Sequence, residues 1–402
     1  MSDGRSLRGR AAIVGIGEST YYKRGKSPDS EFELCLKAVL AAAEDAQIDV
    51  RDVDGLVSFG GDKNEPPKIA AALGIKDLKV SAMQATISGG GSSGHIGIAA
   101  AAVATGMADN VIAYRAITQP PAARFGLGAY GGGGGSSSSE VSGHGLGGIT
   151  AAYGFITPAQ KYALRAQRLL EVVGVAPSTF EAVARAAYHH AQCNEHAVMH
   201  GRPLSSETYQ NSRWISEPFR LYDCCAESDG AAAVLITHKA AAEAMRDDPV
   251  YVLAAAGGGP LRSAAQENVP DYVTGGFKTL APRLFEQAGL GPEDIDVLQV
   301  YDNFTAGVVM ALIEHGFCTP EDVAAVLTFD NLTVPGGSLP LNTSGGNFAE
   351  AYVQAMQMHV EAVRQLRGTA INQVPDAKTC LCAGGPMTSV STSVIYGTRD
   401  VL

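Results

Sequence analysis

The sequence predicts an α/β fold in which helices cover a sheet and in which one half of the chain repeats the other. Two observations lead to this prediction. Patterns typical of buried strands alternate with patterns typical of helices, and a long segment of the second half matches a segment of the first. A chain of 402 residues is long enough for two such halves.

The alternation of strands and helices begins near the N-terminus. Short apolar runs bounded by glycines indicate buried strands, and apolar residues at a spacing of three or four indicate helices. A Gly-rich stretch opens one of the helices. The expected elements are a strand at 11–19, a helix at 30–47, a strand at 54–59, a helix at 94–105 and a strand at 111–114.

Internal repetition is the second observation. Residues 35–59 align with residues 277–301 without a gap, and the Ser-Gly-Gly that begins at Ser88 occurs again at Ser344. Two matches in the same order are better explained by duplication than by chance. Halves of this kind are expected to pack about a pseudo-two-fold axis.

The repeat divides the chain into a first half, 1–240, and a second half, 241–402. The first half contains a long insertion at about 115–223. Its Gly- and Ser-rich part, 126–145, is of low complexity and is expected to be flexible. Further on, Thr157 is expected to cap a helix that a proline opens. Connections of this length often cover a functional site.

Composition narrows the classes of function. The formal net charge is −11 and no Lys/Arg run occurs, which disfavours binding to nucleic acid and to an anionic membrane surface. No apolar stretch reaches the length of a membrane helix or a signal peptide, so we expect a cytoplasmic protein. Seven cysteines without disulfide or metal-ligand spacing predict no metal site. The Gly- and Ser-rich stretch lacks the Gly-Lys-Ser/Thr of a phosphate loop, and we expect no cofactor bound in this chain.

One polar and glycine-rich stretch, LNTSGGNFAEAY, ends at Tyr352. Asn342 and Ser344 can cap a helix, and Gly345 and Gly346 allow a ligand to approach the backbone closely. We expect a helix to start after the glycines, with Tyr352 one turn inside it. Its first amides would then be free donors for an anion or an oxyanion. Plain loop geometry is the alternative.

Several stretches together resemble thiolases of the sterol-carrier-protein type. They are the duplicated halves, the Gly-rich helix start, residues 211–234, Tyr301-Asp-Asn-Phe-Thr and Asn342-Thr-Ser-Gly-Gly. The resemblance covers nearly the whole chain. It implies a thiolase fold of five layers, αβαβα, a homodimer, and an acyl-CoA substrate in which coenzyme A is part of the substrate.

The chain departs from the thiolase pattern at its catalytic positions. Gly91 stands about where a thiolase carries its nucleophilic cysteine. Tyr301 and Tyr352 stand where two catalytic histidines belong, and Cys382 lies near the place of the second catalytic cysteine. These departures disfavour thiolysis, while the two tyrosines suggest that proton transfer has been kept.

Both tyrosine motifs resemble the thiolase-like aldolases of steroid side-chain degradation, the lipid-transfer-protein-2 type. That resemblance implies retro-aldol cleavage of a β-hydroxyacyl-CoA, such as a steroid 17-hydroxy-20-carboxyl-CoA, to a 17-ketosteroid and propionyl-CoA. It also implies a DUF35-type partner, an OB-fold with a zinc ribbon that binds acyl-CoA, in a heterotetramer. Two other functions stay open: a thiolase or acyltransferase acting on 3-ketoacyl-CoA, and a non-catalytic lipid-carrier subunit.

The expected mechanism uses one tyrosine as proton acceptor and the other as proton donor. A phenol has an ordinary pKa of about 10, so a tyrosine that acts as a base needs a polarising neighbour. Which tyrosine has which role is left open. Supporting roles are considered for Asp302, Asn303, His95 and Cys382, and substrate contacts for Asn342, Ser344, Gly345 and Gly346. Turn formation, capping and plain burial are the alternatives for these residues.

Overall fold

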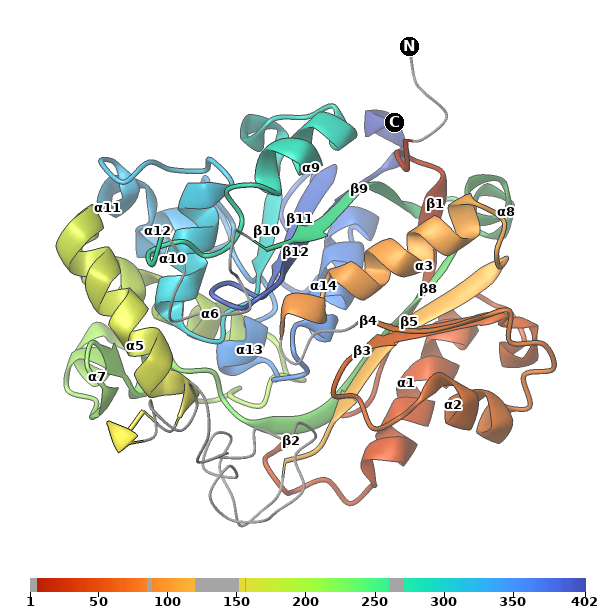
Figure 1. Ribbon diagram of the computed structural model, residues 1–402, viewed down its shortest axis with the longest axis horizontal. Coiled ribbons are helices and arrows are strands. Elements are labelled where there is room, and N and C mark those ends of the chain that lie inside the picture. The colour runs from red at the N-terminus through yellow and green to blue at the C-terminus, as the bar shows by residue number, and fades with distance from the viewer. Residues whose placement is uncertain (1–5, 85–88, 120–151, 156, 260–270) are drawn as a thin grey trace.

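The structure is a computed structural model that describes residues 6–84, 89–119, 152–155, 157–259 and 271–402. One mixed sheet of 10 strands runs through the described part of the chain (Figure 1). The strand β2 (Tyr22–Lys23) pairs with β8 at its side. The other strands are, in sheet order, β10 (Val297–Val300), β11 (Thr379–Gly384), β12 (Ser391–Gly397), β9 (Val250–Gly258), β1 (Ala11–Glu18), β8 (Ser228–His238), β5 (Asn110–Ile117), β3 (Gly55–Phe59) and β4 (Val80–Gln84).

The sheet contains the same strand arrangement twice. From its centre outwards, β1 pairs antiparallel with β8, β8 pairs antiparallel with β5, and β5 pairs parallel with β3. On the other side β9, β12, β11 and β10 pair in the same three ways. Only two residue pairs, Ala12 with Tyr251 and Ile13 with Val250, join β1 to β9. The predicted duplication is confirmed, because β3 and β10 end the two aligned segments and occupy equivalent places.

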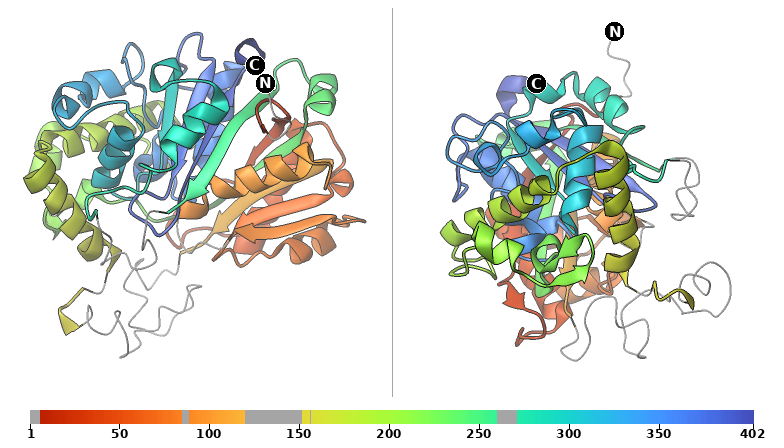
Figure 2. Two further views of the ribbon diagram at one scale, coloured as in Figure 1. Left: turned by 45° about the horizontal axis from the view of Figure 1, so that its top comes forward. Right: turned by 90° about the vertical axis from the view of Figure 1, so that its left-hand side faces the viewer.

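Helices form three layers around the two halves of the sheet (Figures 1 and 2). Side chains on one face of each half pack in one core cluster, and those on the other face pack in a second cluster around the central helices. This is the predicted five-layered arrangement. The outer layers contain α1 (Glu31–Asp45) and α9 (Ala281–Ala288), and the central layer contains α3 (Gly94–Ala104) and α14 (Met356–Arg367).

The insertion in the first half contributes helices that pack against the second half. Thr157 caps the first of them through a hydrogen bond from the Gln160 amide, as predicted. The Gly- and Ser-rich residues 126–145 lie outside the described residues. The insertion contains α5 (Pro158–Arg168), the π-helical turn η3 (Leu169–Val173), α6 (Ser178–Cys193), α7 (Ser206–Gln210), β6 (Trp214–Ser216), β7 (Phe219–Arg220) and the 3-10 turn η4 (Leu221–Asp223).

The remaining elements connect these layers. Both α5 and α6 contact α10, and α6 also contacts α11, α12 and α13. In the described part of the chain, no helix is both long and apolar enough to cross a membrane. These connecting elements are η1 (Val50–Asp52), α2 (Pro66–Leu73), η2 (Gly89–Gly91), α8 (Lys239–Met245), η6 (Pro292–Asp294), α10 (Thr305–Glu314), α11 (Val323–Val326), α12 (Phe329–Leu332), α13 (Gly346–Ala349) and η7 (Arg399–Val401).

Close packing of α1 on β1 depends on glycine. An added Cβ at Gly15 would lie 2.0 Å from the carbonyl oxygen of Ala42, and one at Gly17 would lie 2.2 Å from that of Ala38. Both alanines are fully buried, so small residues face each other on the helix and on the strand. The backbones of the two elements therefore approach closely.

Substitution of Gly15 tests this packing. In Gly15→Ala the new methyl group meets a backbone oxygen that can move only with the whole helix. We expect the free energy of unfolding to fall by roughly 1–3 kcal/mol in chemical denaturation. Ala72→Ser is the control, because it adds one atom at an exposed position of α2. An equal or larger loss in the control would contradict the close-packing argument.

Candidate active site

Two tyrosines from separate motifs meet in the core. The hydroxyl oxygens of Tyr301 and Tyr352 are 3.0 Å apart, and their rings lie at an interplanar angle of 68°. Their side chains are 2 % and 3 % exposed. Tyr301 directly follows β10, and Tyr352 lies between α13 and α14. The structure therefore brings together the two residues predicted to be catalytic.

The predicted position of Tyr352 inside a helix is wrong. The helix that starts after the glycines, α13, ends at Ala349, and the next helix starts at Met356. Gln354 and Ala355 have φ of +51° and +66°, a left-handed conformation that interrupts the helix. The Tyr352 amide instead donates to Ser228 Oγ at 2.5 Å.

The expectation that the first amides of this helix are free for a ligand is also wrong. The carboxylate of Asp302 accepts hydrogen bonds from the amides of Asn347, at 2.8 Å, and Phe348, at 3.3 Å. An added Cβ at Gly346 would lie 2.4 Å from Asp302 Oδ2. The close approach that the glycine allows is therefore made by the chain's own carboxylate.

Asn342 and Ser344 do not cap the helix, contrary to the prediction. Asn342 accepts from the amide of Val300 at 2.8 Å and donates to its carbonyl at 2.9 Å, next to Tyr301. Ser344 Oγ donates to the carboxylate of Glu350 at 2.6 Å. Both residues are buried, and they hold the segments on either side of the tyrosines.

Gly345 and Asn303 shape the turns beside the tyrosines. The φ of Gly345 is +117°, and an added Cβ there would lie 2.9 Å from the amide nitrogen of Glu350. Asn303 Oδ1 accepts from the amide of Phe304 at 2.9 Å. The carbonyl oxygen of Asn303 accepts from the amide of Cys225 at 3.0 Å. The predicted substrate contacts of Asn342, Ser344, Gly345 and Gly346 stay predictions.

His95 is a buried, neutral histidine. Its Nδ1 donates to the carbonyl of Gly91 at 2.9 Å, and its Nε2 lies 3.2 Å from the sulfur of Met356. Burial and the neighbouring His359 lower the pKa of His95 to about 3. The side chain is fully buried, so it holds η2 and α14 together, and a pocket-facing role finds no support.

Cys382 lies in β11 on the same side as Cys380, as the spacing of two residues predicts. Burial alone would raise the pKa of Cys382, but a hydrogen bond from Cys380 and the nearby His359 outweigh it and lower that pKa. Its Sγ is 4.0 Å from the carbonyl oxygen of Met358. A catalytic role for this thiol stays a prediction.

The Gly-rich turn η2 fits closely against Tyr301. An added Cβ at Gly89 would lie 2.2 Å from the ring atoms Cε2 and Cζ of Tyr301. An added Cβ at Gly90 would lie 2.0 Å from the carbonyl oxygen of Val390. Gly91 accepts the His95 hydrogen bond through its carbonyl. The turn that would carry the nucleophile of a thiolase thus packs against a phenol ring here.

A segment within residues 211–234, which carry part of the family resemblance but were given no site residue, lies between the two tyrosine-bearing segments. The amide of Cys225 donates to the carbonyl of Asn303, and the amide of Ala226 donates to the carbonyl of Asn347 at 3.1 Å. Ser228 then accepts from the Tyr352 amide. These contacts join residues far apart in the chain, so no local sequence pattern indicated them.

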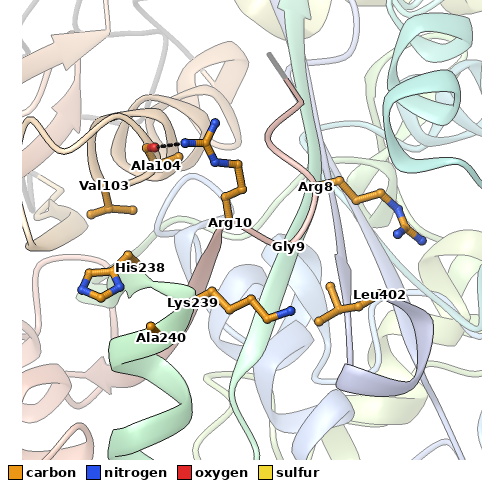
Figure 3. Close-up of a pocket in the computed structure, with 9 residues that line it drawn as sticks. All are labelled: Arg8, Gly9, Arg10, Val103, Ala104, His238, Lys239, Ala240 and Leu402. Carbon is orange, nitrogen blue, oxygen red and sulfur yellow. Dashed lines mark hydrogen bonds between the residues drawn. The ribbon is translucent and has the colours of Figure 1, made fainter. Parts of the chain in front are cut away.

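Neither of two surface cavities includes the tyrosines in its lining. One, of about 510 Å³, lies between the start of β1 and the start of α8, where Arg10 donates to the carbonyl of Ala104 at 2.6 Å (Figure 3). The other, of about 670 Å³, lies beside β2 and residues 195–198. Among the described residues, no group of three or more His, Cys, Asp or Glu side chains could hold a metal ion.

Comparison with known proteins places the chain among thiolase-like enzymes. Residues 259–398 match the family model of the thiolase C-terminal domain. The chain is 38% identical to the 17-hydroxy-3-oxo-4-pregnene-20-carboxyl-CoA lyase of Mycobacterium tuberculosis, over 96% of this chain and 98% of that protein. The chain belongs to the thiolase-like steroid aldolase family.

Two further members of this aldolase family agree with that assignment. The steroid side-chain-cleaving aldolase of Thermomonospora curvata is 37% identical over 96% of this chain and 97% of that protein. The solved Ltp2-ChsH2(DUF35) aldolase superposes with a TM-score of 0.88 at 34% identity, over 98% of this chain and 99% of that chain. The predicted family and fold are both confirmed.

In this aldolase-family chain the Asp302 carboxyl makes stability depend on pH. Burial raises the pKa of Asp302 from 3.8 to about 7, against the opposing hydrogen bonds from Asn347 and Phe348. Its stabilising contribution is therefore complete below about pH 4 and is lost as the pH rises through 7. We expect the free energy of unfolding of the wild type, relative to Asp302→Asn, to fall by about 3 kcal/mol between these pH values.

Chemical denaturation of both proteins at several pH values measures this difference. Exposed Asp77 provides the control, because Asp77→Asn should keep a constant difference from the wild type over the same range. If the difference in free energy of unfolding between the wild type and Asp302→Asn stays constant from pH 4 to pH 7, the prediction that burial raises the pKa of Asp302 is wrong.

Proposed function

We propose that the chain is a retro-aldol lyase that cleaves a β-hydroxyacyl-CoA whose hydroxyl group is on a steroid ring carbon. The proposed substrate is a steroid 17-hydroxy-20-carboxyl-CoA, and the products are a 17-ketosteroid and propionyl-CoA. The observation that carries the proposal is the contact of 3.0 Å between the hydroxyls of Tyr301 and Tyr352. Relatives named as lyase and side-chain-cleaving aldolase support the substrate class.

The cleavage needs two proton transfers and no redox step. The hydroxyl group loses its proton, the carbon–carbon bond breaks, and its electron pair passes to the thioester as an enolate. A proton is then added to the α-carbon. One tyrosine takes the first proton and the other supplies the second. Coenzyme A takes part only as the thioester of the substrate, so the reaction requires no separate cofactor.

The two alternatives have less support. Thiolysis needs a thiolate that can reach the acyl group. The Gly-rich turn carries no cysteine, and Cys382 is buried in β11. A non-catalytic lipid carrier has no need for two buried phenols in hydrogen-bond contact. Thiolysis of a 3-ketoacyl-CoA by free CoA would revive the first alternative, and binding of acyl-CoA without turnover would favour the second.

Substitution of each tyrosine tests the aldolase function. We expect Tyr301→Phe and Tyr352→Phe each to slow release of ketone and propionyl-CoA by about 100-fold or more, because each removes one proton transfer. The assay follows both products with the chain and a DUF35-type partner together. Tyr153→Phe, at an exposed tyrosine, is the control. Absence of both products with the wild type would contradict the proposal, and a near wild-type rate in either variant would remove that tyrosine's role.

We further propose a cytoplasmic heterotetramer, with a homodimer of this chain at its core and a DUF35-type acyl-CoA-binding partner. The Ltp2-ChsH2(DUF35) aldolase supports the class of partner. Exposed apolar side chains in the insertion support the insertion as the place where this partner binds, because they lie on the neighbouring elements α5, η3, β6 and η4. These side chains, the insertion surface, are Leu164, Val172, Trp214 and Leu221.

Charge substitutions on the insertion surface test this location. Val172 and Trp214 are 59% and 46% exposed, so replacement by glutamate should leave the fold intact. We expect Val172→Glu and Trp214→Glu each to weaken partner binding at least tenfold in calorimetry, because a charge would be buried on association. Met107→Glu, at a residue 62% exposed outside the insertion, should bind normally. Unchanged affinity in both insertion variants would place the partner elsewhere.

A further inference from the structure

One short segment, at the start of β8, reaches both tyrosine-bearing segments. The amide of Cys225 donates to the carbonyl of Asn303, two residues after Tyr301, at 3.0 Å. Three residues further along, Ser228 Oγ accepts from the amide of Tyr352 at 2.5 Å. The position of each tyrosine relative to the other therefore depends on contacts that this segment makes with both.

Ser228 belongs to the buried framework of the sheet. It is fully buried and begins β8, the strand that lies between β1 and β5. The next residue, Asp229, is also buried, and its carboxylate accepts hydrogen bonds from the amides of Lys26, at 3.0 Å, and Gln119, at 2.8 Å. The Ser228 hydroxyl is therefore presented by a strand that is fixed on both sides and at its end.

Tyr352, in contrast, lies in a turn between two helices, α13 and α14. Other amides of this turn bond to α13: that of Ala351 donates to the carbonyl of Gly346, and that of Ala355 donates to Asn347 Oδ1, each at 3.2 Å. These bonds hold the turn to the neighbouring helix. The bond at Tyr352 differs, because its acceptor belongs to the sheet.

The strand and the turn also pack against each other beside this bond. Ser228 and Gly230 are two residues apart in β8, so they face the same side of the strand. An added Cβ at Gly230 would lie 2.5 Å from Cδ1 of Tyr21 and 3.5 Å from Cγ2 of Val353. Val353 directly follows Tyr352 and is fully buried. Strand and turn are therefore in contact on the face from which the Ser228 hydroxyl reaches the Tyr352 amide.

We propose that Ser228 is a positioning residue of the tyrosine site: its hydroxyl holds the Tyr352 backbone to the sheet and thereby sets the distance between the two phenols. The proposal rests on the proposed retro-aldol function and adds a residue that acts through Tyr352. The hydroxyls of Tyr301 and Tyr352 are 3.0 Å apart, at the long end of the range for two hydroxyl groups, so a small displacement breaks their contact. A displacement of about 1 Å can slow a reaction by about 100-fold.

Removal of the hydroxyl affects one tyrosine and not the other. Without it the buried amide of Tyr352 has lost its acceptor, and the turn shifts towards water or another acceptor because an unpaired buried N–H is unfavourable. Tyr301 does not follow, since its own amide donates to the carbonyl of Ala383, in β11, at 2.8 Å. The two phenols therefore separate, although every side chain that faces the substrate is still present.

Ser19 provides a matched control. Its Oγ accepts from the amide of Ala231, also in β8, at 2.9 Å, and the residue is only 7% exposed. Ser19→Ala and Ser228→Ala each remove one hydroxyl that accepts from a buried amide, so we expect similar losses in free energy of unfolding. The two variants differ in the amide that is left unpaired, because only that of Tyr352 belongs to the tyrosine site.

Turnover by the two variants is compared in the complex with the partner. We expect Ser228→Ala to lower kcat by about 10- to 100-fold with KM within about twofold, because the hydroxyl orients Tyr352 without touching the substrate. Ser19→Ala should keep both constants within about twofold of the wild type. An equal loss of kcat in both variants would indicate general loosening of β8 and would overturn the proposal, as would a wild-type kcat in Ser228→Ala.

Amide hydrogen exchange tests the same contact without turnover. Exchange in peptides that cover residues 350–355 of the full chain is followed by mass spectrometry. We expect it to be about tenfold faster or more in Ser228→Ala and unchanged in Ser19→Ala, with α14 as internal reference. Unchanged exchange in Ser228→Ala would overturn the role of Ser228. Absence of product with the wild type would contradict the proposed function, whereas exchange would still decide whether Ser228 holds Tyr352.

Discussion

The buried carboxylate of Asp302 is the interaction on which the site depends. It follows Tyr301 directly in the chain, and it binds the two amides at the start of α13, which leads to Tyr352. One side chain thus fixes the distance between two segments that approach from different directions. The same contact requires glycine at position 346, because a Cβ there would meet the carboxylate. The Gly-Gly motif therefore serves the assembly of the site.

The two halves of the chain contribute differently to this arrangement. The second half supplies both tyrosines and Asp302, while the first half supplies their surroundings. Gly89 lies against the ring of Tyr301, and Ser228 holds the Tyr352 amide. The sheet itself joins the halves through only two residue pairs between β1 and β9. Contacts at the site therefore add to the few sheet contacts that hold the halves in register.

Much of the fold could be predicted from the sequence, because strand and helix periodicity and the gapless repeat are local patterns. The repeat placed Tyr301 at the end of a strand, where the structure has it. The helix around Tyr352 was predicted wrongly, because neither Gln354 nor Ala355 is a residue type that signals a left-handed turn. The hydrogen-bond partner of the amides at the start of α13 could not be predicted either, since Asp302 lies 45 positions before Asn347 in the chain. Ser228 and Tyr352, 124 positions apart, meet only in the folded protein.

The fit of Tyr301 against the Gly-rich turn also bears on which residues of the site can change independently. A phenol ring now fills the space next to Gly89, so even a methyl group there would collide with it. A larger residue at position 89 would therefore have to arrive together with a smaller residue at position 301. Each change alone leaves either a collision or an empty space in a buried site. Gly89 and Tyr301 are therefore expected to vary together or not at all, so that the phenol and the glycine facing it form one unit in the evolution of this site.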